Sequence, residues 1–309
     1  MLPVPADPSQ RYRGRFAPSP TGSLHFGSLV AAVGSHADAR AHGGEWLVRM
    51  EDLDAPRTVP GAAAAILHGL AALGMTSDAP VLLQSRRGEA YSAALDRLAW
   101  AGLTYPCACS RREIADSAGR FGALANGPRE RVYPGTCRNG LAPGRSARAV
   151  RCRTGDAPIA FEDAVQGTVR QCLARAVGDF VLLRADGIFA YQLAVVVDDA
   201  AQGITDVVRG ADLLDSTPRQ IHLQRALGVP TPRYCHLPVA TDARGEKLSK
   251  QTRAAPIDLG RPADALRQAL GFLGHRPPAG LNEVDALWAW ATENWDRTRI
   301  PRTRTIPVA

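Results

Sequence analysis

Lysine is almost absent from this chain, and its two lysines lie close together. Among the 37 lysine and arginine residues, only Lys247 and Lys250 are lysines, and both follow Gly245 in the segment GEKLSKQ. Arginine carries a planar guanidinium, whereas lysine carries a compact, mobile ammonium that can follow a phosphate along a reaction path. We therefore interpret residues 245–251 as a catalytic phosphate-binding loop rather than as a solvated surface loop.

A second candidate site lies near the N-terminus, where the sequence has the pattern of a nucleotide-binding strand, turn and helix. Residues 11–17 (RYRGRFA) predict a strand, residues 18–23 (PSPTGS) a rigid turn, and residues 24–41 a helix. The N-terminus of such a helix presents free backbone N–H groups and a positive dipole end to an anion. Gly27 would let a ligand approach the backbone closely. His25 lies at the same end, so we expect phosphate binding here.

Three cysteines could hold a metal ion. The segment 104–147, which contains Cys107, Cys109 and Cys137, is rich in glycine, proline and arginine and offers little for a hydrophobic core. Three thiolates suit a tetrahedral Zn²⁺ ion, which would staple such a segment, and water or Cys152 could complete the site. A set of small buried thiols is the alternative interpretation. The remaining cysteines, Cys172 and Cys235, are expected in the core.

Composition limits the class of protein. The 309-residue chain is 45% hydrophobic, which is enough for a sizeable core, and its net charge of +7 suits an anionic partner such as a nucleotide or RNA. It has no apolar run of the roughly 18 residues that cross a membrane, and no secretory signal. The six cysteines are too few and too clustered for a disulfide framework. We therefore expect a cytoplasmic protein that does not associate with membranes.

Alternating strands and helices must position these candidate sites. Residues 46–50 predict a second strand, which ends at the carboxylates Glu51, Asp52 and Asp54. Such alternation is typical of an α/β fold with a mostly parallel sheet, helices on both faces, and ligands at the carboxyl ends of the strands. Further strands are expected in 148–172, at 180–184 and 188–190 around an Asp-Gly turn, at 205–210 and at 234–240; helices are expected at 60–73, 87–101, 191–201, 212–228, 262–274 and 282–295, before an Arg/Pro tail.

Several segments resemble the class I aminoacyl-tRNA synthetases of the glutamyl and glutaminyl type. Residues 15–28 (RFAPSPTGSLHFGS) resemble the first signature of that class, and residues 247–251 (KLSKQ) resemble the second. Residues 189–199 and 208–213 are also similar to glutamyl-type enzymes, and the resemblance covers roughly residues 11–275. Because the two signatures occur in the expected order and context, together they are a strong indication of this family.

The resemblance implies a Rossmann-like class I synthetase catalytic domain. Two positions depart from the signatures: Ser28 stands where histidine is usual, and Leu248 where methionine is usual. Ser28 can donate a hydrogen bond but cannot act as a second imidazolium. We divide the chain into two halves of the catalytic domain, 11–103 and 148–261, a zinc-binding insertion, 104–147, and a C-terminal helical segment with a tail, 262–309.

The resemblance also implies roles for the residues of the two signatures. His25, Gly27 and Ser28 would bind ATP together with Mg²⁺. Lys250 would bind ATP as well and stabilise the pentavalent phosphorus and the departing pyrophosphate, with assistance from Lys247.

Glutamate would be recognised through its three charges. Arg15 and Arg209 would hold the two carboxylates, because a guanidinium fork matches a carboxylate. Glu51 would accept hydrogen bonds from the ammonium group. At the cysteines of the insertion, the resemblance implies Tyr133 as the fourth zinc ligand. The other residues that the resemblance places at glutamate are Phe16, Ala17, Pro18, Ser19 and Tyr191.

The length of the chain narrows the resemblance. Conventional glutamyl-tRNA synthetases carry a long anticodon-binding region after the second signature, and too few residues follow Lys250 to form it. With its cysteine-containing insertion, the chain resembles the branch of the family that activates glutamate without tRNA and transfers it to the queuosine base in the anticodon of tRNA(Asp). The expected partners are ATP, L-glutamate and queuosine-bearing tRNA(Asp), bound by a monomer.

Two alternatives remain open at this point. One is a short conventional glutamyl-tRNA synthetase that charges the 3′ end of a tRNA. The other is a catalytically inactive synthetase-like module that binds RNA or protein, although retention of the two lysines argues against it. The arginines of the insertion could grip an RNA backbone or form a solvated surface; these are Arg111, Arg112, Arg129 and Arg131.

Overall fold

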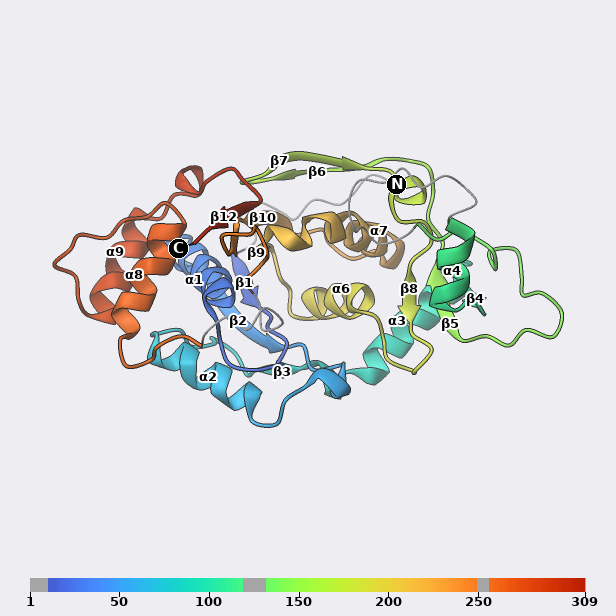
Figure 1. Ribbon diagram of the computed structural model, residues 1–309, viewed down its shortest axis with the longest axis horizontal. Helices are drawn as coiled ribbons and strands as arrows, with labels where there is room; N and C mark the ends of the chain where they lie inside the picture. Colours follow the sequence, from blue (N-terminus) through green and yellow to red (C-terminus); the bar gives the residue numbers. More distant parts are fainter. Residues whose placement is uncertain (1–10, 119–131, 249–255, 309) are drawn as a thin grey trace.

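Parallel strands form the centre of the molecule (Figure 1). The computed structural model describes residues 11–118, 132–248 and 256–308. Strands β1, β2 and β3 pair in parallel, as do β9 and β10, and β1 lies beside β9, where the Thr205 N–H donates to the Arg13 carbonyl at 3.0 Å. The expected α/β fold with a parallel sheet is confirmed. These strands are β1 (Arg13–Phe16), β2 (Glu45–Met50), β3 (Leu82–Leu83), β9 (Asp206–Gly210) and β10 (Arg233–Leu237).

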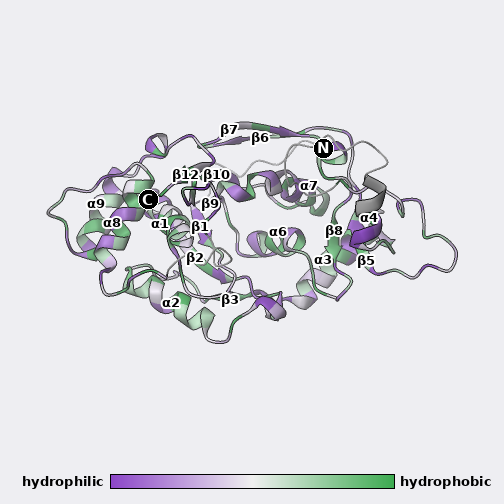
Figure 2. Cartoon of the chain, viewed as in Figure 1, coloured by the Kyte–Doolittle hydropathy of each residue, from purple (hydrophilic) through white to green (hydrophobic). Residues whose placement is uncertain are grey.

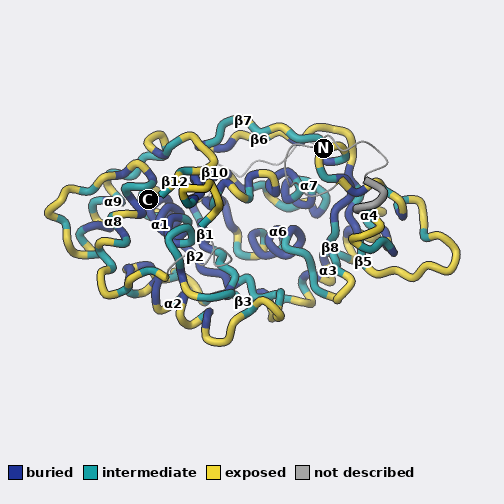
Figure 3. The backbone as a smooth tube through the Cα atoms, viewed as in Figure 1, coloured by how far each residue is buried: buried dark blue, intermediate teal, exposed yellow. Residues whose placement is uncertain are grey.

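Helices cover both faces of these strands because successive strand residues point to opposite faces. Val48 and Val208 pack with α1, α8 and α9, whereas Leu47 and Val207 pack with α3, α6 and α7. Figure 3 shows α1, α6 and α7 as largely buried, while the periphery is exposed. The helices are α1 (Phe26–Ala41), α2 (Ala62–Ala72), α3 (Gly88–Trp100), α6 (Tyr191–Ala201), α7 (Thr217–Leu227), α8 (Pro262–Phe272) and α9 (Val284–Asn294).

A separate small sheet at one end of the molecule joins the first strand of the insertion to two strands that follow the insertion (Figure 1). Strands β4, β5 and β8 pair antiparallel, and the insertion packs around Tyr105, Tyr133 and its cysteines. Figure 2 shows the start of its helix α4 as hydrophilic, in keeping with Arg111 and Arg112. Arg129 and Arg131 lie outside the described residues. The elements here are β4 (Thr104–Cys107), α4 (Arg111–Ala118), β5 (Ala149–Cys152) and β8 (Val181–Leu183).

A hairpin links the insertion to the central strands. Strands β6 and β7 pair antiparallel, and β6 lies parallel to β10 through Asp163 and Tyr234. The pair confirms the short strands predicted in 148–172. The hairpin consists of β6 (Ile159–Asp163) and β7 (Gly167–Gln171) and is followed by α5 (Leu173–Ala176).

Two expected elements are divided by proline or by a tighter helical turn. The strand expected at 234–240 breaks at Pro238, which has no N–H for a sheet ladder, so that β11 (Val239–Thr241) follows β10 as a separate strand. The helix expected at 212–228 begins as a 3₁₀ segment, η3 (Ala211–Ser216), before α7. The remaining 3₁₀ turns are η1 (Ala55–Arg57), η2 (Gln84–Arg86) and η4 (Arg297–Arg299).

The C-terminal residues do not form the expected tail but pack onto the central strands and α1. Strand β12 (Thr305–Pro307) pairs in parallel with β11. The buried carboxylate of Asp38 on α1 accepts hydrogen bonds from Tyr12, from the Trp295 indole at 2.9 Å, and from the Arg297 Nε at 2.7 Å. A single buried carboxylate therefore ties the C-terminal segment to α1. Within the described residues, no helix is both long and apolar enough to span a membrane.

Replacing Asp38 by asparagine should strongly destabilise the fold. The substitution keeps the shape of the side chain but leaves the Arg297 guanidinium with only its more distant buried partner, Asp206, at 3.3 Å, which costs up to about 3–5 kcal/mol. Urea titration would measure the loss of unfolding free energy. Asp215→Asn, which removes an exposed ion pair with Arg304, is the control and should cost at most about 1 kcal/mol. Equal losses in the two variants would contradict the anchoring role of Asp38.

Candidate active site

A cavity of about 1140 Å³ opens at the carboxyl ends of β1, β2, β9 and β10. The predicted ATP and glutamate residues within the described chain come together in its wall; Lys250 lies outside the described residues. The predicted residues that line the cavity are Arg15, Phe16, Ala17, Pro18, Ser19, His25, Gly27, Ser28, Glu51, Tyr191, Arg209 and Lys247.

His25 and Ser28 form a reciprocal cap at the N-terminus of α1. The Ser28 N–H donates to His25 Nδ1 at 3.3 Å, and the His25 N–H donates to Ser28 Oγ at 2.9 Å. Two backbone donors of the first turn are thereby satisfied. Since Nδ1 accepts, the neutral imidazole carries its proton on Nε2. Ser28, at the position where the signature usually has histidine, therefore contributes its hydroxyl to the cap.

Gly27 brings the two signature segments into contact. A Cβ atom at this position would lie 2.8 Å from the Leu248 carbonyl oxygen and 3.3 Å from the His25 ring. Any side chain would push the loop that carries Lys247 (residues 245–251, the lysine loop) away from α1. The sequence predicted close approach of a ligand to Gly27, and the structure places the backbone of the lysine loop there.

The lysine loop returns along the edge of β11. The Leu248 N–H donates to the Ala240 carbonyl at 2.9 Å, and the Asp242 carboxylate accepts from the N–H groups of Arg244 and Glu246 in the turn. Strand β12 occupies the other edge of β11. The loop is therefore braced by the C-terminal segment.

Lys247 is held toward the cavity by an ion pair. Its Nζ lies 2.6 Å from a carboxylate oxygen of Asp212 in η3. In the same 3₁₀ segment, Asp215 pairs with Arg304, which directly precedes β12. The loop that carries Lys247 thus contacts η3 on one side and a strand braced by β12 on the other.

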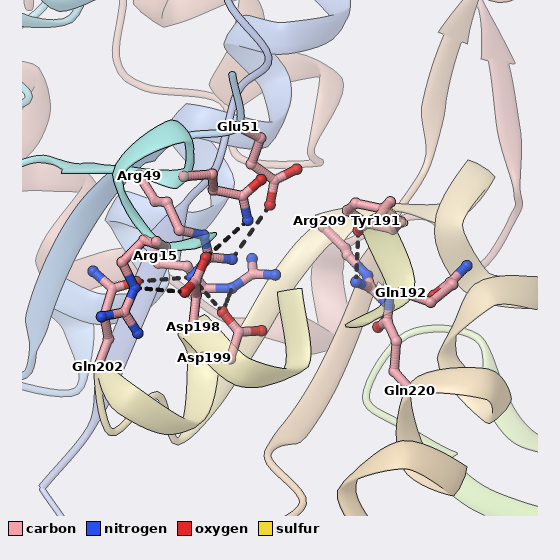
Figure 4. A network of polar contacts seen from close by, with 12 residues as sticks. Arg15, Arg49, Glu51, Tyr191, Gln192, Asp198, Asp199, Gln202, Arg209 and Gln220 are labelled. Carbon is pink, nitrogen blue, oxygen red and sulfur yellow. Dashed lines mark hydrogen bonds and ion pairs between the residues drawn. The ribbon is translucent and has the colours of Figure 1, made fainter. Parts of the chain in front are cut away.

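Two arginines meet at one buried carboxylate on α6 (Figure 4). Asp199 accepts from Arg15 Nε at 3.1 Å and from Arg49 Nη1 at 2.7 Å. Burial alone would raise the pKa of Asp199, but the attraction of Arg15 and Arg49 outweighs it and holds the pKa below its usual value. The carboxylate is therefore ionised, and it fixes the Nε side of Arg15 while the cavity receives the other side.

Glu51 is placed at the end of β2 by backbone and side-chain contacts. Its N–H donates to the Pro18 carbonyl at 2.9 Å, and its carboxylate lies 3.4 Å from Arg49 Nη2. Burial raises the pKa of Glu51, although Arg49 and Arg15 oppose the rise. A carboxylate that is buried in this way gains most from a cation placed beside it.

Arg209 is oriented by four side chains. Its Nε donates to His236 Nε2 at 3.1 Å, its Nη2 to Thr217 and Gln220 at 2.8 and 2.7 Å, and its Nη1 to the Tyr191 hydroxyl at 3.3 Å. Figure 4 shows Arg209, Tyr191 and Gln220 grouped apart from the Asp199 network. The guanidinium is therefore fixed before any ligand arrives.

A neutral histidine completes this arrangement. His236 Nδ1 lies 2.6 Å from an Asp163 carboxylate oxygen, so the ring donates there and accepts from Arg209 through Nε2. Burial lowers the pKa of His236 to about 4; Asp163 opposes this shift and Arg209 adds to it. An imidazolium could not accept from Arg209, so the orientation of Arg209 requires the neutral ring.

Comparison with known proteins decides the family. The family described as "tRNA synthetases class I (E and Q), catalytic domain" matches residues 11–283. A glutamyl-Q tRNA(Asp) synthetase from Dechloromonas aromatica is 62% identical, with 96% of this chain and 97% of the relative covered. One from Chromobacterium violaceum is 58% identical, with 94% and 95% covered. The chain belongs to the glutamyl-Q tRNA(Asp) synthetases.

Solved structures agree on the fold of this family member. Glutamate-tRNA synthetase from Elizabethkingia anophelis superposes with a TM-score of 0.80 at 23% identity, covering 97% of this chain and 68% of its own. The protein is thus an enzyme of the ligase class with a class I synthetase catalytic domain.

Sequence reasoning missed the buried residues that orient the synthetase's predicted ligand-binding groups. The cavity wall does not include Arg49, Asp199, Asp163 or His236. These residues act by orienting Arg15, Glu51 and Arg209. Two signals were available: Arg49 is a charged residue inside an apolar strand, and two adjacent aspartates, including Asp199, end an apolar helix.

The insertion of this synthetase brings three thiols together. The Sγ atoms of Cys107, Cys109 and Cys137 lie within 4.8 Å of one another, and those of Cys109 and Cys137 are 3.6 Å apart. Thiolates around a tetrahedral Zn²⁺ at 2.3 Å would lie roughly 3.8 Å apart. The spacing therefore fits zinc. Cys152 lies outside this group and bonds the Arg153 carbonyl, which removes it as a candidate ligand.

Tyr133 and Arg151 complete the surroundings of the thiols. The Tyr133 hydroxyl lies 3.4 Å from Cys107 Sγ and 3.6 Å from Cys109 Sγ, so it is in place to be a fourth ligand. Arg151 donates to Cys107 Sγ at 3.3 Å and stacks on the Tyr133 ring. Its positive charge suits the net negative charge of a Zn²⁺ ion with three thiolates. A bound Zn²⁺ would crosslink the insertion.

Of the two cysteines expected in the core, Cys235 is buried and Cys172 is half-buried.

The neutral state of His236 predicts a pH dependence of stability. The unfolded imidazole, with a pKa of about 6.5, binds a proton between pH 4 and 6.5 that the folded ring does not bind, so the unfolding free energy falls as pH falls through this window. His236→Gln should reduce that slope by up to about 1.4 kcal/mol per pH unit. Urea unfolding at several pH values would measure it. His68→Gln, on the exposed side of α2, should leave the slope unchanged; an unaltered slope in the His236 variant would contradict the neutral ring.

Cys109→Ser should remove the metal from the insertion. We expect about one zinc ion per chain in the wild-type protein, since the site is a single group of thiols, and close to none in the variant. The midpoint of thermal unfolding should fall with the metal. Elemental analysis and calorimetry would measure both effects. Cys172→Ser is the matched control, because that thiol bonds the Asp156 carbonyl and lies outside the group. The same zinc content in both variants would show that the thiols do not bind zinc.

Proposed function

We propose that this synthetase activates glutamate with ATP to glutamyl-adenylate in the absence of tRNA and then transfers the glutamate to the queuosine base of tRNA(Asp). The transfer is supported by the relatives named glutamyl-Q tRNA(Asp) synthetase, which match nearly the whole chain at 58–62% identity. Activation without tRNA is our own inference from a site whose side chains are already oriented.

One observation carries the proposal: a single cavity joins both signature segments to charges that complement glutamate. Its described wall carries more cationic than anionic side chains, which suits ATP and glutamate, since both are anions at neutral pH. The cations are Arg15, Arg57, Arg184, Arg209 and Lys247, and the carboxylates are Glu51, Asp54 and Asp212.

In the first step, a carboxylate oxygen of glutamate attacks the α-phosphorus of ATP, and the bond to the pyrophosphate oxygen breaks. Positioning and charge stabilisation supply most of such a rate enhancement. We assign the phosphates to His25, Lys247 and the N-terminus of α1, where backbone N–H groups point at an anion. Lys250 would stabilise the departing pyrophosphate. Mg²⁺ would accompany ATP and neutralise part of its charge.

Glutamate recognition follows from the pre-oriented side chains. Arg15 and Arg209 would bind the two carboxylates, and Glu51 would accept the ammonium group and regain a charge partner in its buried position. Because Arg209 is held by protein partners, a ligand whose side chain fails to reach it leaves a buried charge without its counterion. Aspartate and glutamine are therefore expected to be poor substrates.

In the second step, a hydroxyl of the acceptor attacks the acyl carbon of the adenylate and AMP leaves. The names of the relatives favour queuosine as this acceptor. A conventional charging reaction at the 3′ end of a tRNA is the alternative within the same chemistry. The contact of the lysine loop with α1 argues against an inactive binding module, because it keeps Lys247 in the wall of the cavity that the first signature lines.

The proposal predicts exchange of pyrophosphate into ATP with glutamate and no tRNA. Lys250→Ala should slow this exchange about 100- to 1000-fold, as is typical when one charge-stabilising donor is lost. Arg244→Ala removes an exposed positive charge close to the same loop, outside the cavity wall, and should retain wild-type exchange. Exchange that requires tRNA would refute tRNA-independent activation. Labelled glutamate on the 3′ end of tRNA(Glu), and none on queuosine-bearing tRNA(Asp), would favour conventional charging.

A further inference from the structure

The cavity, with a volume of about 1140 Å³, extends beyond the residues assigned to ATP and glutamate. Part of its wall has no role in the assignments above and comes from two loops, one after β2 and one after β8. The residues of this third part are Leu53, Asp54, Arg57, Arg184, Ile188 and Phe189.

Asp54 joins the two loops. Its carboxylate lies 3.0 Å from Arg184 Nη1 on the β8 hairpin and 3.5 Å from Arg57 Nε in its own loop. Arg184 also pairs with Asp186, at 2.6 Å, on the tip of the hairpin. Asp54 faces the cavity, whereas Asp186 is not part of the cavity wall. The two aspartates therefore bind different nitrogen atoms of the same guanidinium group.

The third part lies next to the proposed glutamate site. Asp54 follows Glu51 by three residues, and Phe189 precedes Tyr191 by two residues in the chain. Both neighbours line the cavity with them. A molecule bound between Asp54 and Phe189 would therefore contact a glutamyl group held by Glu51 and Tyr191.

We infer that Asp54, Arg57 and Arg184, together with Ile188 and Phe189, form the subsite for the acceptor nucleoside. The inference rests on the proposed function, since transfer requires the acceptor hydroxyl to enter the cavity that holds the adenylate. A carboxylate accepts hydrogen bonds from nucleoside hydroxyls, and guanidinium groups bind the flanking phosphates. The apolar pair offers a surface against which a base can pack.

The transfer of the glutamyl group to the acceptor needs no reactant besides the adenylate and the acceptor hydroxyl. The acceptor oxygen forms a bond to the acyl carbon, the bond between that carbon and the phosphate oxygen breaks, and AMP departs with the electron pair. The hydroxyl proton passes to the AMP phosphate. Asp54 orients the hydroxyl, while Arg57 and Arg184 hold the backbone that carries it.

Two variants that change the same ion pair test the subsite. Asp54→Asn should leave tRNA-independent pyrophosphate exchange within about twofold of wild type and should slow single-turnover transfer from preformed adenylate to queuosine-bearing tRNA(Asp) by about 10- to 100-fold, the effect of losing a hydrogen bond to a charged group. Asp186→Asn also removes a carboxylate from Arg184 but lies outside the cavity wall. It should retain both activities.

A third variant guards against a folding defect in the first. Arg57 is mostly exposed, with 61% of its side chain accessible, so Arg57→Ala should fold normally. It should raise the KM for tRNA about 10-fold and weaken the dependence of that KM on salt, since a phosphate contact is lost.

The possible outcomes separate this inference from the proposed function. Normal transfer by both Asp54→Asn and Arg57→Ala would overturn the subsite while leaving activation intact. Loss of exchange in parallel with transfer in either variant would also overturn the subsite, because the residue would then act in activation. A wild-type protein with no exchange would overturn the proposed function and the subsite with it. Selective loss of transfer in both variants, with Asp186→Asn unaffected, would establish the subsite.

Discussion

The carboxylate of Asp199 is the constraint on which the glutamate end of the site depends. It lies buried between the guanidinium groups of Arg15 and Arg49, and removing it would leave both guanidinium groups without their closest buried anion. Helix α6 carries this carboxylate near its last turn and Tyr191 at its first residue. The position of α6 against β1 and β2 therefore sets Arg15, Glu51 and Tyr191 together.

The same helix is held from its other side, which makes that position rigid. Asp198 accepts hydrogen bonds from Gln84, Arg87 and Tyr91, on and before α3. The two adjacent aspartates thus bind on opposite sides of α6: Asp199 binds arginines of the sheet, and Asp198 binds residues on and before α3. Two negative side chains near the C-terminal end of a helix are unfavourable for the helix dipole, and the arginines on both sides offset that effect. Helix α6 is thus less stable on its own, but its two aspartates fix the positions of the side chains around the ligand.

Local patterns account for what the sequence could predict. The strand, turn and helix around residues 11–41, the helix α6 and the turn at Asp186 and Gly187 all depend on neighbouring residues, and all are present. The strand expected at 188–190 was wrong, because Phe189 forms only an isolated bridge with Leu183. The order of strands in a parallel sheet does not depend on neighbouring residues. The pairing of β12 with β11 could therefore not be predicted from the Arg/Pro-rich sequence of the tail. The ion pairs of Asp199 were missed for the same reason, because its partner Arg15 is distant in the chain. His25 was expected to bind phosphate, but its role as the cap of α1 depends on the reciprocal bond with Ser28, which only the fold reveals.

The shortage of lysine has a consequence for chemical labelling. Reagents that acylate primary amines would find two side chains in this protein, Lys247 and Lys250, besides the α-amino group. Lys247 is accessible over 47% of its side chain, so a fluorophore or crosslinker of this type would be directed to the loop at the mouth of the cavity. An endoprotease that cuts after lysine has its only two sites in the same loop. The arginine-rich composition thus makes one loop chemically addressable in the unaltered protein, and the rate of its modification would report whether nucleotide covers it.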